Sequence, residues 1–166
     1  ANDRWVLTAE LQTMGLNAIR IEALTDKSMP RNGPGRAGNG NFALSDIRVF
    51  AANKKGGQRV PVKLVNPKAT HQQNTAGLSV ASSIDGDKRK RGWAVDFGGI
   101  GKEQAAVFEF AAPVGFEGGT ILTVEMDFYV NTSHTIGRPR LAVTAAPRPV
   151  AIKGDSSAAS MATLLT

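Results

Sequence analysis

The chain has 166 residues, enough for one domain with a single core, and no cysteine, which excludes disulfides, thiolate metal sites and cysteine nucleophiles. Its net charge of +6 favours acidic partners such as nucleic acid, anionic membranes or acidic polysaccharides, although a soluble surface with a positive bias is the other interpretation. No apolar run approaches the roughly 18 residues that span a bilayer, so we expect no membrane insertion.

Apolar and polar residues alternate along much of the chain, which is typical of half-buried β-strands. The pattern is clearest in 121–128, where Leu122 and Val124 point to one side and Thr123 and Glu125 to the other. In chain order, the predicted strands are 5–9, 18–23, 41–52, 60–66, 78–84, 92–95, 106–110, 121–128 and 138–143. Glycine-rich turns separate them and no long amphipathic helix competes, so we predict an all-β, antiparallel β-sandwich of the jelly-roll kind.

One predicted strand, 41–52, contains a change of phase. Phe42 and Leu44 share one parity, whereas Ile47 and Val49 have the other. A β-bulge near residues 45–46 would reconcile the two halves, and bulges often re-aim side chains beside functional sites.

The chain divides into a predicted β-sandwich binding domain over residues 1–150 and a predicted linker over 151–166. Residues 154–160 are mostly small and polar, as in flexible linkers. Residues 161–166 resemble the beginning of a neighbouring domain that is missing, so we expect the linker to lead to one.

Sequence motifs for catalysis are lacking, and we expect no enzyme activity. The two histidines, His71 and His134, fall in different predicted loops, and no nucleophile elbow, P-loop or dinucleotide fingerprint is found. The aromatic residues do not interleave with basic ones as they do in single-strand binders, so we expect no nucleic-acid partner.

Two carboxylates flank a tight turn at Asp85-Gly86-Asp87. Hard oxygen ligands on such a loop suit calcium, whereas the alternative is a plain turn in which Asp85 binds its own backbone. The basic run that follows, 88–91, would weaken a cation site and is either a solvated loop or a contact for an acidic ligand.

Residues 81–87 followed by Gly92-Trp93 resemble the Asp-Gly loop of discoidin-like, galactose-binding-like modules, a family of carbohydrate-binding and adhesion β-sandwiches. Residues 41–50 are similar to the closing strand of that family, but the order is reversed, as in a circular permutation. The resemblance implies a structural calcium ion, and it places the ligands at Asp85, Asp87, Asp46 in place of the usual Glu, and the carbonyl of Ser45.

A second resemblance covers more of the chain. The blocks 20–26, 33–37, 40–42 and 134–138 with 141–144 look like one domain that recurs inside large exported planctomycete and verrucomicrobial multidomain proteins. This resemblance implies an extracellular, cell-surface or periplasmic location and contacts with other domains of a parent protein.

The function that we predict is that of a non-catalytic carbohydrate-binding module for a complex or acidic polysaccharide, because Arg and Asn side chains pair well with sugar hydroxyls and acidic groups. Trp93 would add a stacking platform if it were exposed, although a core position is the alternative. The other candidate ligand-binding residues form two clusters. The loop cluster contains Arg31, Asn32, Arg36, Asn39 and Asn41. The second cluster, near residue 138, contains His134, Arg138 and Arg140.

Two alternatives stay open. Each cluster would also be explained by a loop that its own hydrogen bonds stabilise. A structural protein–protein docking domain within a large exported protein is the second function, and an exposed apolar patch of several hundred Å² would favour it.

Overall fold

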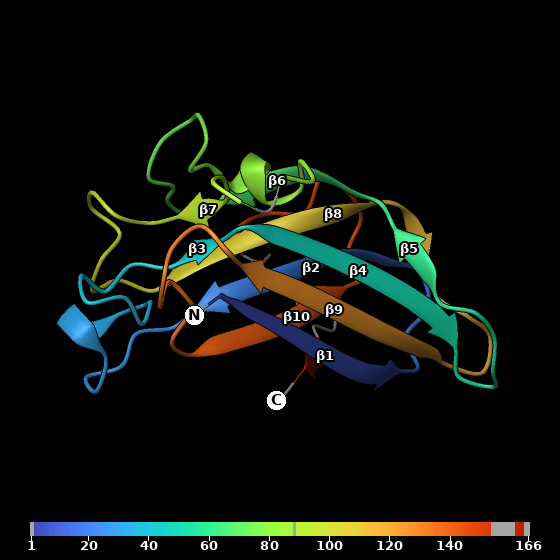
Figure 1. The fold of residues 1–166 in the computed structure, drawn as a ribbon. Coiled ribbons are helices and arrows are strands. Elements are labelled where there is room, and N and C mark those ends of the chain that lie inside the picture. Colours follow the sequence, from blue (N-terminus) through green and yellow to red (C-terminus); the bar gives the residue numbers. More distant parts are fainter. Residues whose placement is uncertain (1, 88, 154–161, 165–166) are drawn as a thin grey trace.

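The structure is a computed structural model in which residues 2–87, 89–153 and 162–164 are described. Two antiparallel sheets pack face to face, as Figure 1 shows, and this confirms the predicted all-β sandwich. In spatial order the first sheet contains β1 (Asp3–Leu11), β9 (Thr120–Phe128), β4 (Asp46–Asn53) and β5 (Val60–Val62). The second contains β11 (Ala162–Leu164), β10 (Pro139–Thr144), β2 (Leu16–Ala23), β8 (Gln104–Val114) and β6 (Leu64–Ala69), and a third, two-stranded sheet pairs β3 (Ala43–Leu44) with β7 (Trp93–Ala94).

The core lies between the two large sheets and follows the alternation of the sequence. Leu122, Val124 and Met126 of β9 are fully buried, and Ile21 of β2 and Phe108 of β8 are fully buried in the same cluster. Burying one such side chain contributes roughly 1.5–3 kcal/mol. The predicted inward face of β9 is therefore confirmed, and Thr123 and Glu125 of the other face are partly exposed.

The predicted strand 41–52 divides at Ser45 into β3 and β4. β3 pairs with β7, while β4 pairs with β9 in the first sheet. The buried Ser45 hydroxyl accepts a hydrogen bond from the Tyr129 amide at 2.7 Å, and the Ser45 amide donates to the Asp127 carbonyl at 2.7 Å. The change of phase in the sequence thus marks a transfer of the chain between sheets.

The predicted strand 78–84 is wrong, because residues Val80–Ser83 form a short 3₁₀ helix, η2. Three serine hydroxyls bond nearby carbonyls: Ser79 and Ser82 donate to Ala76 at 2.9 and 3.0 Å, and Ser83 donates to Val80 at 2.7 Å. Such local bonds compete with strand pairing, and the apolar spacing of the segment gives no sign of them.

The segment that follows β10 crosses the outer face of the second sheet. Arg148 donates to the Phe110 carbonyl at 2.8 Å, and Val150 packs against Ala18 and Val107. Residues 154–161 of the predicted linker lie outside the described residues, and β11 pairs with β10. The predicted role of 151–166 as a connection to another domain stays a prediction.

A buried carboxylate holds this segment in place. Glu109, 1% exposed, points away from the core and accepts hydrogen bonds from the Asn66 side chain and the Val150 amide, each at 2.8 Å. The Asn66 bond, with those from Val150 and Lys68, holds the pKa of Glu109 below its usual value although burial opposes this.

No helix among the described residues is long and apolar enough to cross a membrane.

We expect Glu109→Gln to lower the free energy of unfolding at pH 7 by about 1–3 kcal/mol, because the amide leaves buried donors unsatisfied. The pKa of Glu109 is lowered in the folded state, so its ionised form stabilises the fold above the unfolded value of about 4.3, and this contribution disappears as the pH falls through the folded pKa. Urea unfolding between pH 7 and pH 3 measures the difference, with the exposed Glu117→Gln as the matched control. A difference that did not shrink on acidification would contradict this account.

Candidate functional site

Three segments that are distant in the sequence meet at one end of the sandwich, on the left in Figure 1: residues 24–42, 95–103 and 129–138. Backbone hydrogen bonds join them, from Arg36 to Thr135 at 3.0 Å, from Gly137 to Pro34 at 2.8 Å and from Gly101 to Gly33 at 2.6 Å. The two candidate clusters of the sequence analysis therefore lie on a single surface, which we call the loop end.

Two hollows in the loop end share Asp26 and Arg138, and we call them the Arg138 hollows. Lys27 and Asn32 line one, and Arg36 lines the other. Three of the charged residues in these linings are basic and one is acidic. Of the predicted ligand-binding residues, the structure thus brings together Asn32, Arg36 and Arg138.

Asp26 is held as a carboxylate between the two hollows. Its Oδ1 accepts from the Ser28 amide at 2.9 Å and from the Ser28 hydroxyl at 2.7 Å, while its Oδ2 lies 3.7 Å from Arg138 Nη1. The bonds from Ser28 and the charge of Arg138 hold the pKa of Asp26 below its usual value. The site therefore presents a fixed anionic acceptor among cationic donors.

The backbone beside these hollows is strained at two consecutive residues. Arg31 and Asn32 have φ values of 51° and 66°, in the left-handed region that non-glycine residues seldom adopt. Hydrogen bonds from Asn32 to the Met29 carbonyl at 3.0 Å and from Asp26 to the Asn32 carbonyl at 3.2 Å maintain the conformation. Strain of about 1–3 kcal/mol per residue persists only where the surroundings enforce it, and it often accompanies function.

Three of the predicted ligand residues are engaged inside the protein. Trp93 is 0% exposed, and its indole nitrogen donates to the His71 carbonyl at 2.8 Å. Asn41 is 5% exposed, and its Oδ1 accepts from the Val95 amide at 3.0 Å. Asn39 donates to the Asp96 carboxylate at 3.0 Å. The alternative of a core tryptophan is the one that the structure shows.

The remaining members of the second cluster lie at its margin. His134 Nδ1 is 2.8 Å from the Thr132 carbonyl, within its own loop. Arg140, on β10, donates to the Glu22 carboxylate of the neighbouring strand β2. Of this cluster, Arg138 is the residue that lines the hollows.

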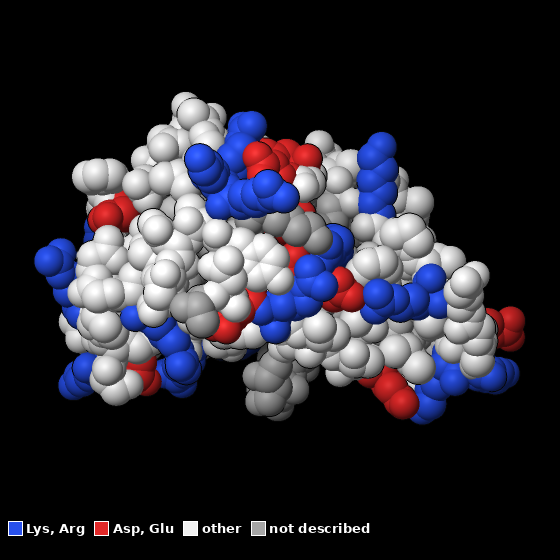
Figure 2. All heavy atoms as spheres, viewed as in Figure 1, with Lys and Arg blue, Asp and Glu red and all other residues white. Residues whose placement is uncertain are grey.

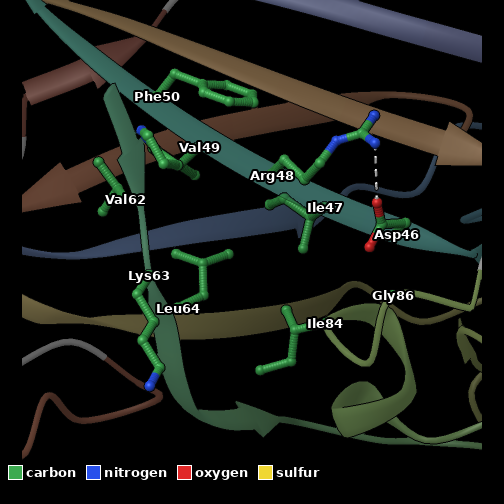
Figure 3. A pocket seen from close by; sticks show the side chains of 11 residues that line it. Asp46, Ile47, Arg48, Val49, Phe50, Val62, Lys63, Leu64, Ile84 and Gly86 are labelled. Carbon is green, nitrogen blue, oxygen red and sulfur yellow. Dashed lines mark ion pairs between the residues drawn. The ribbon is translucent and has the colours of Figure 1, made fainter. Parts of the chain in front are cut away.

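One candidate calcium ligand, Asp46, lines another hollow of about 440 Å³, which Figure 3 shows. Asp46 of β4 and Gly86 both line it, so the structure brings the Asp-Gly turn to the strand that the resemblance indicates. Asp85 Oδ1 accepts from the Asp87 amide at 2.9 Å and its Oδ2 pairs with Arg91 at 3.3 Å. The turn therefore has the self-bonded geometry of the plain alternative.

Other groups of the protein already contact the predicted ligands. Arg48 Nη1 lies 3.5 Å from the Asp46 carboxylate, and Asp87 accepts from the Arg89 amide at 3.1 Å. The Ser45 hydroxyl accepts a hydrogen bond from the Tyr129 amide. Within residues 2–87, 89–153 and 162–164, no group of three or more His, Cys, Asp or Glu side chains is placed to hold a metal. Calcium binding stays a prediction.

The hollow beside β4 is mainly aliphatic, and the register of β5 explains why it is there. β5 pairs with β4 over Val49, Phe50 and Ala51, so among the described residues the edge of β4 before Val49 has no strand partner on that side. Leu64 and Ile84 form much of the wall (Figure 3). The Arg138 hollows differ from it in being lined by charged and polar groups.

The charge on the broad face of the first sheet is compensated. Figure 2 shows Lys and Arg side chains interleaved with Asp and Glu over β1, β9 and β4. Arg4 and Arg48 lie 2.6 and 3.0 Å from the buried Asp127, and Arg59 lies 3.0 Å from Glu125. This face offers a polyanion little net positive charge.

Sequence reasoning missed Asp26 and Lys27. The available signal was Asp26 placed two residues before Ser28, a spacing typical of Asx turns, in which a carboxylate is fixed by the following backbone.

No protein-family model, curated protein or solved structure matches the chain. The geometry of the site therefore carries the functional argument.

Glycine is required at Gly35 of the loop end, because a Cβ there would lie 1.9 Å from the Asn41 carbonyl oxygen. We expect Gly35→Ala to lower the free energy of unfolding by at least about 1–3 kcal/mol, the usual range for overpacking. Gly38→Ala is the matched control, since nothing lies within 4 Å of its Cβ position. Chemical denaturation compares the two variants, and equal stabilities would refute the close approach.

Proposed function

We propose that the chain is a non-catalytic carbohydrate-binding domain that holds a complex, acidic polysaccharide in the Arg138 hollows. The observation that carries the proposal is the convergence of Lys27, Arg36 and Arg138 around the fixed carboxylate of Asp26. The proposed location is outside the cell or in the periplasm, as the resemblance to domains of large exported proteins implies.

The chemistry of these groups suits an acidic sugar. A guanidinium presents paired donors to a carboxylate or sulfate, and the Arg36 and Arg138 side chains are both exposed. While it is ionised, the Asp26 carboxylate acts only as a hydrogen-bond acceptor, and sugar hydroxyls are suitable donors to it. A carboxylate in the middle of the site repels any anionic group that approaches it, so the acidic groups of the ligand are expected beside Arg36 and Arg138 and its hydroxyls beside Asp26.

The rigidity of the surrounding loops supports binding. Backbone bonds at Arg36, Gly101 and Gly137 connect the three segments. Side chains on preorganised loops lose less conformational entropy on binding, which leaves more of the contact energy as affinity. No group of this site is proposed to perform chemistry on the sugar.

Affinity electrophoresis against polygalacturonate, alginate and hyaluronate, with dextran as the neutral polymer, tests the proposal. We expect at least one acidic polymer to retard the domain more than dextran does. Arg36→Gln and Arg138→Gln should each weaken this binding about tenfold, because a charged hydrogen bond contributes ~1.5–3 kcal/mol. The control is Arg59→Gln, an exposed arginine paired with Glu125 on the first sheet, which should bind like the wild type.

The same gels, run with calcium and again with EDTA, test the calcium prediction. Retardation that is lost in EDTA would support an ion among Asp46, Asp85 and Asp87, and unchanged retardation would remove the ion from the proposal. If no polymer in the panel retarded the domain, the proposal of carbohydrate binding would be refuted, and a protein–protein docking domain would replace it.

A further inference from the structure

Phe97 is the most exposed of the large hydrophobic side chains that stand out on the described surface, with 79% of its area accessible. The other six phenylalanines are buried or half-buried. An aromatic ring in water forgoes the free energy of burial that these six obtain. Its position therefore calls for an explanation outside the core.

The backbone at Phe97 is also strained, which is an independent observation. Its φ is 57°, a left-handed value that is unusual for a bulky residue. The Asp96 carboxylate accepts from the Phe97 amide at 2.8 Å and from Asn39 at 3.0 Å. The loop is thus held in a conformation that displays the ring.

The neighbouring bonds make this loop rigid. Gly99 donates to the Val95 carbonyl at 3.0 Å, and Lys102 donates to the Gly98 carbonyl at 3.0 Å. His71 Nε2 lies 3.1 Å from the Asp96 carbonyl oxygen. An exposed aromatic side chain on such a loop is well suited to anchor a ligand, because ordering its two side-chain torsions costs little entropy.

The Phe97 loop belongs to the same surface as the Arg138 hollows. Gly101 lines one hollow and donates to the Gly33 carbonyl at 2.6 Å, while Asp96 bonds Asn39 of the opposite loop. Both loops lie at the left end of the sandwich in Figure 1. A ligand long enough to extend from the hollows along this end can therefore reach the Phe97 loop.

We propose that Phe97 is a stacking platform for the C–H face of a pyranose ring, in the same polysaccharide whose acidic group binds Arg138. The inference rests on the proposed function and narrows its ligand class to an oligosaccharide of several rings. A pyranose ring has an apolar face of axial C–H groups, which packs on an aromatic ring, while its equatorial hydroxyls remain available to polar neighbours. An isolated anion or a single uronic acid would use the hollows without the platform.

The test measures dissociation constants by affinity electrophoresis against polygalacturonate, alginate and hyaluronate, for the wild type, Phe97→Ala, Phe97→Tyr and Arg138→Gln. We expect Phe97→Ala to bind the retarding polymer about tenfold more weakly, because aromatic stacking is of this size, and Phe97→Tyr to bind like the wild type. Val6→Ala, at another exposed apolar side chain on β1, is the matched control and should change nothing. Thermal unfolding of each variant separates lost contact from lost structure.

Salt separates the two kinds of contact. Between 0.05 and 0.5 M NaCl (about a threefold change in Debye length), the effect of Arg138→Gln should shrink, whereas the effect of Phe97→Ala should persist. If Arg138→Gln weakens binding and Phe97→Ala does not, the platform is refuted and the proposed function stands. If no polymer retards the wild type, both are refuted. Retention of oligo(dT) that depends on Phe97 would assign the ring to nucleic-acid bases and overturn the sugar assignment.

Discussion

The loop end is organised around one buried amide, the side chain of Asn41. Its Oδ1 accepts from the Val95 amide at 3.0 Å, and its Nδ2 lies 3.4 Å from Gln73 Oε1. The backbone amide of Asn41 donates to Asn39 Oδ1 at 3.1 Å. Because a buried polar group left without a partner costs about 1–3 kcal/mol, these contacts hold the loop of Asn41 against Val95 and Gln73.

Three of the non-glycine residues with a left-handed backbone can be understood from this arrangement. Arg31 and Asn32 lie in the loop that leads into Asn41, and Phe97 lies two residues after Val95, which Asn41 binds. Left-handed backbone at such positions is retained only if the folded surroundings offset its cost. The sandwich core supplies that stability at a distance, so the loops keep exposed side chains in fixed positions. Both the proposed sugar site and the proposed platform use residues of this kind.

The sequence predicts the sheets better than it predicts the loop end. The alternation in β9 reports burial directly, and the change of phase between Leu44 and Ile47 correctly marks an irregularity, although the structure transfers the chain to another sheet there. The prediction of a strand over Val80–Ser83 is wrong because hydrogen bonds of serine hydroxyls stabilise a 3₁₀ turn there, and such bonds leave no trace in the apolar periodicity of the sequence.

At the site, sequence reasoning named Arg36 and Arg138 but placed them in separate clusters. Their proximity depends on backbone bonds between residues a hundred positions apart, which no local pattern reports. Phe97 was missed for a physical reason. It shares the parity of Trp93 and Val95, both buried, so a strand extended past Val95 would place it in the core. The left-handed turn at Phe97 reverses that expectation, and the Asp96 carboxylate holds it through a local bond from the Phe97 amide and a tertiary bond from Asn39.

The distribution of charge decides what the net charge of +6 means for function. On the first sheet, Asp127 is fully buried between Arg4 and Arg48, so the basic side chains there neutralise a carboxylate of the protein itself. Removing such a charge leaves its partner unsatisfied, and the consequence is a loss of stability. In the Arg138 hollows the basic residues outnumber the single carboxylate, and their side chains are exposed. Charge that the fold neutralises is not available to an external polyanion, and the excess of basic residues in the Arg138 hollows is why we place the ligand at the loop end and not on the first sheet.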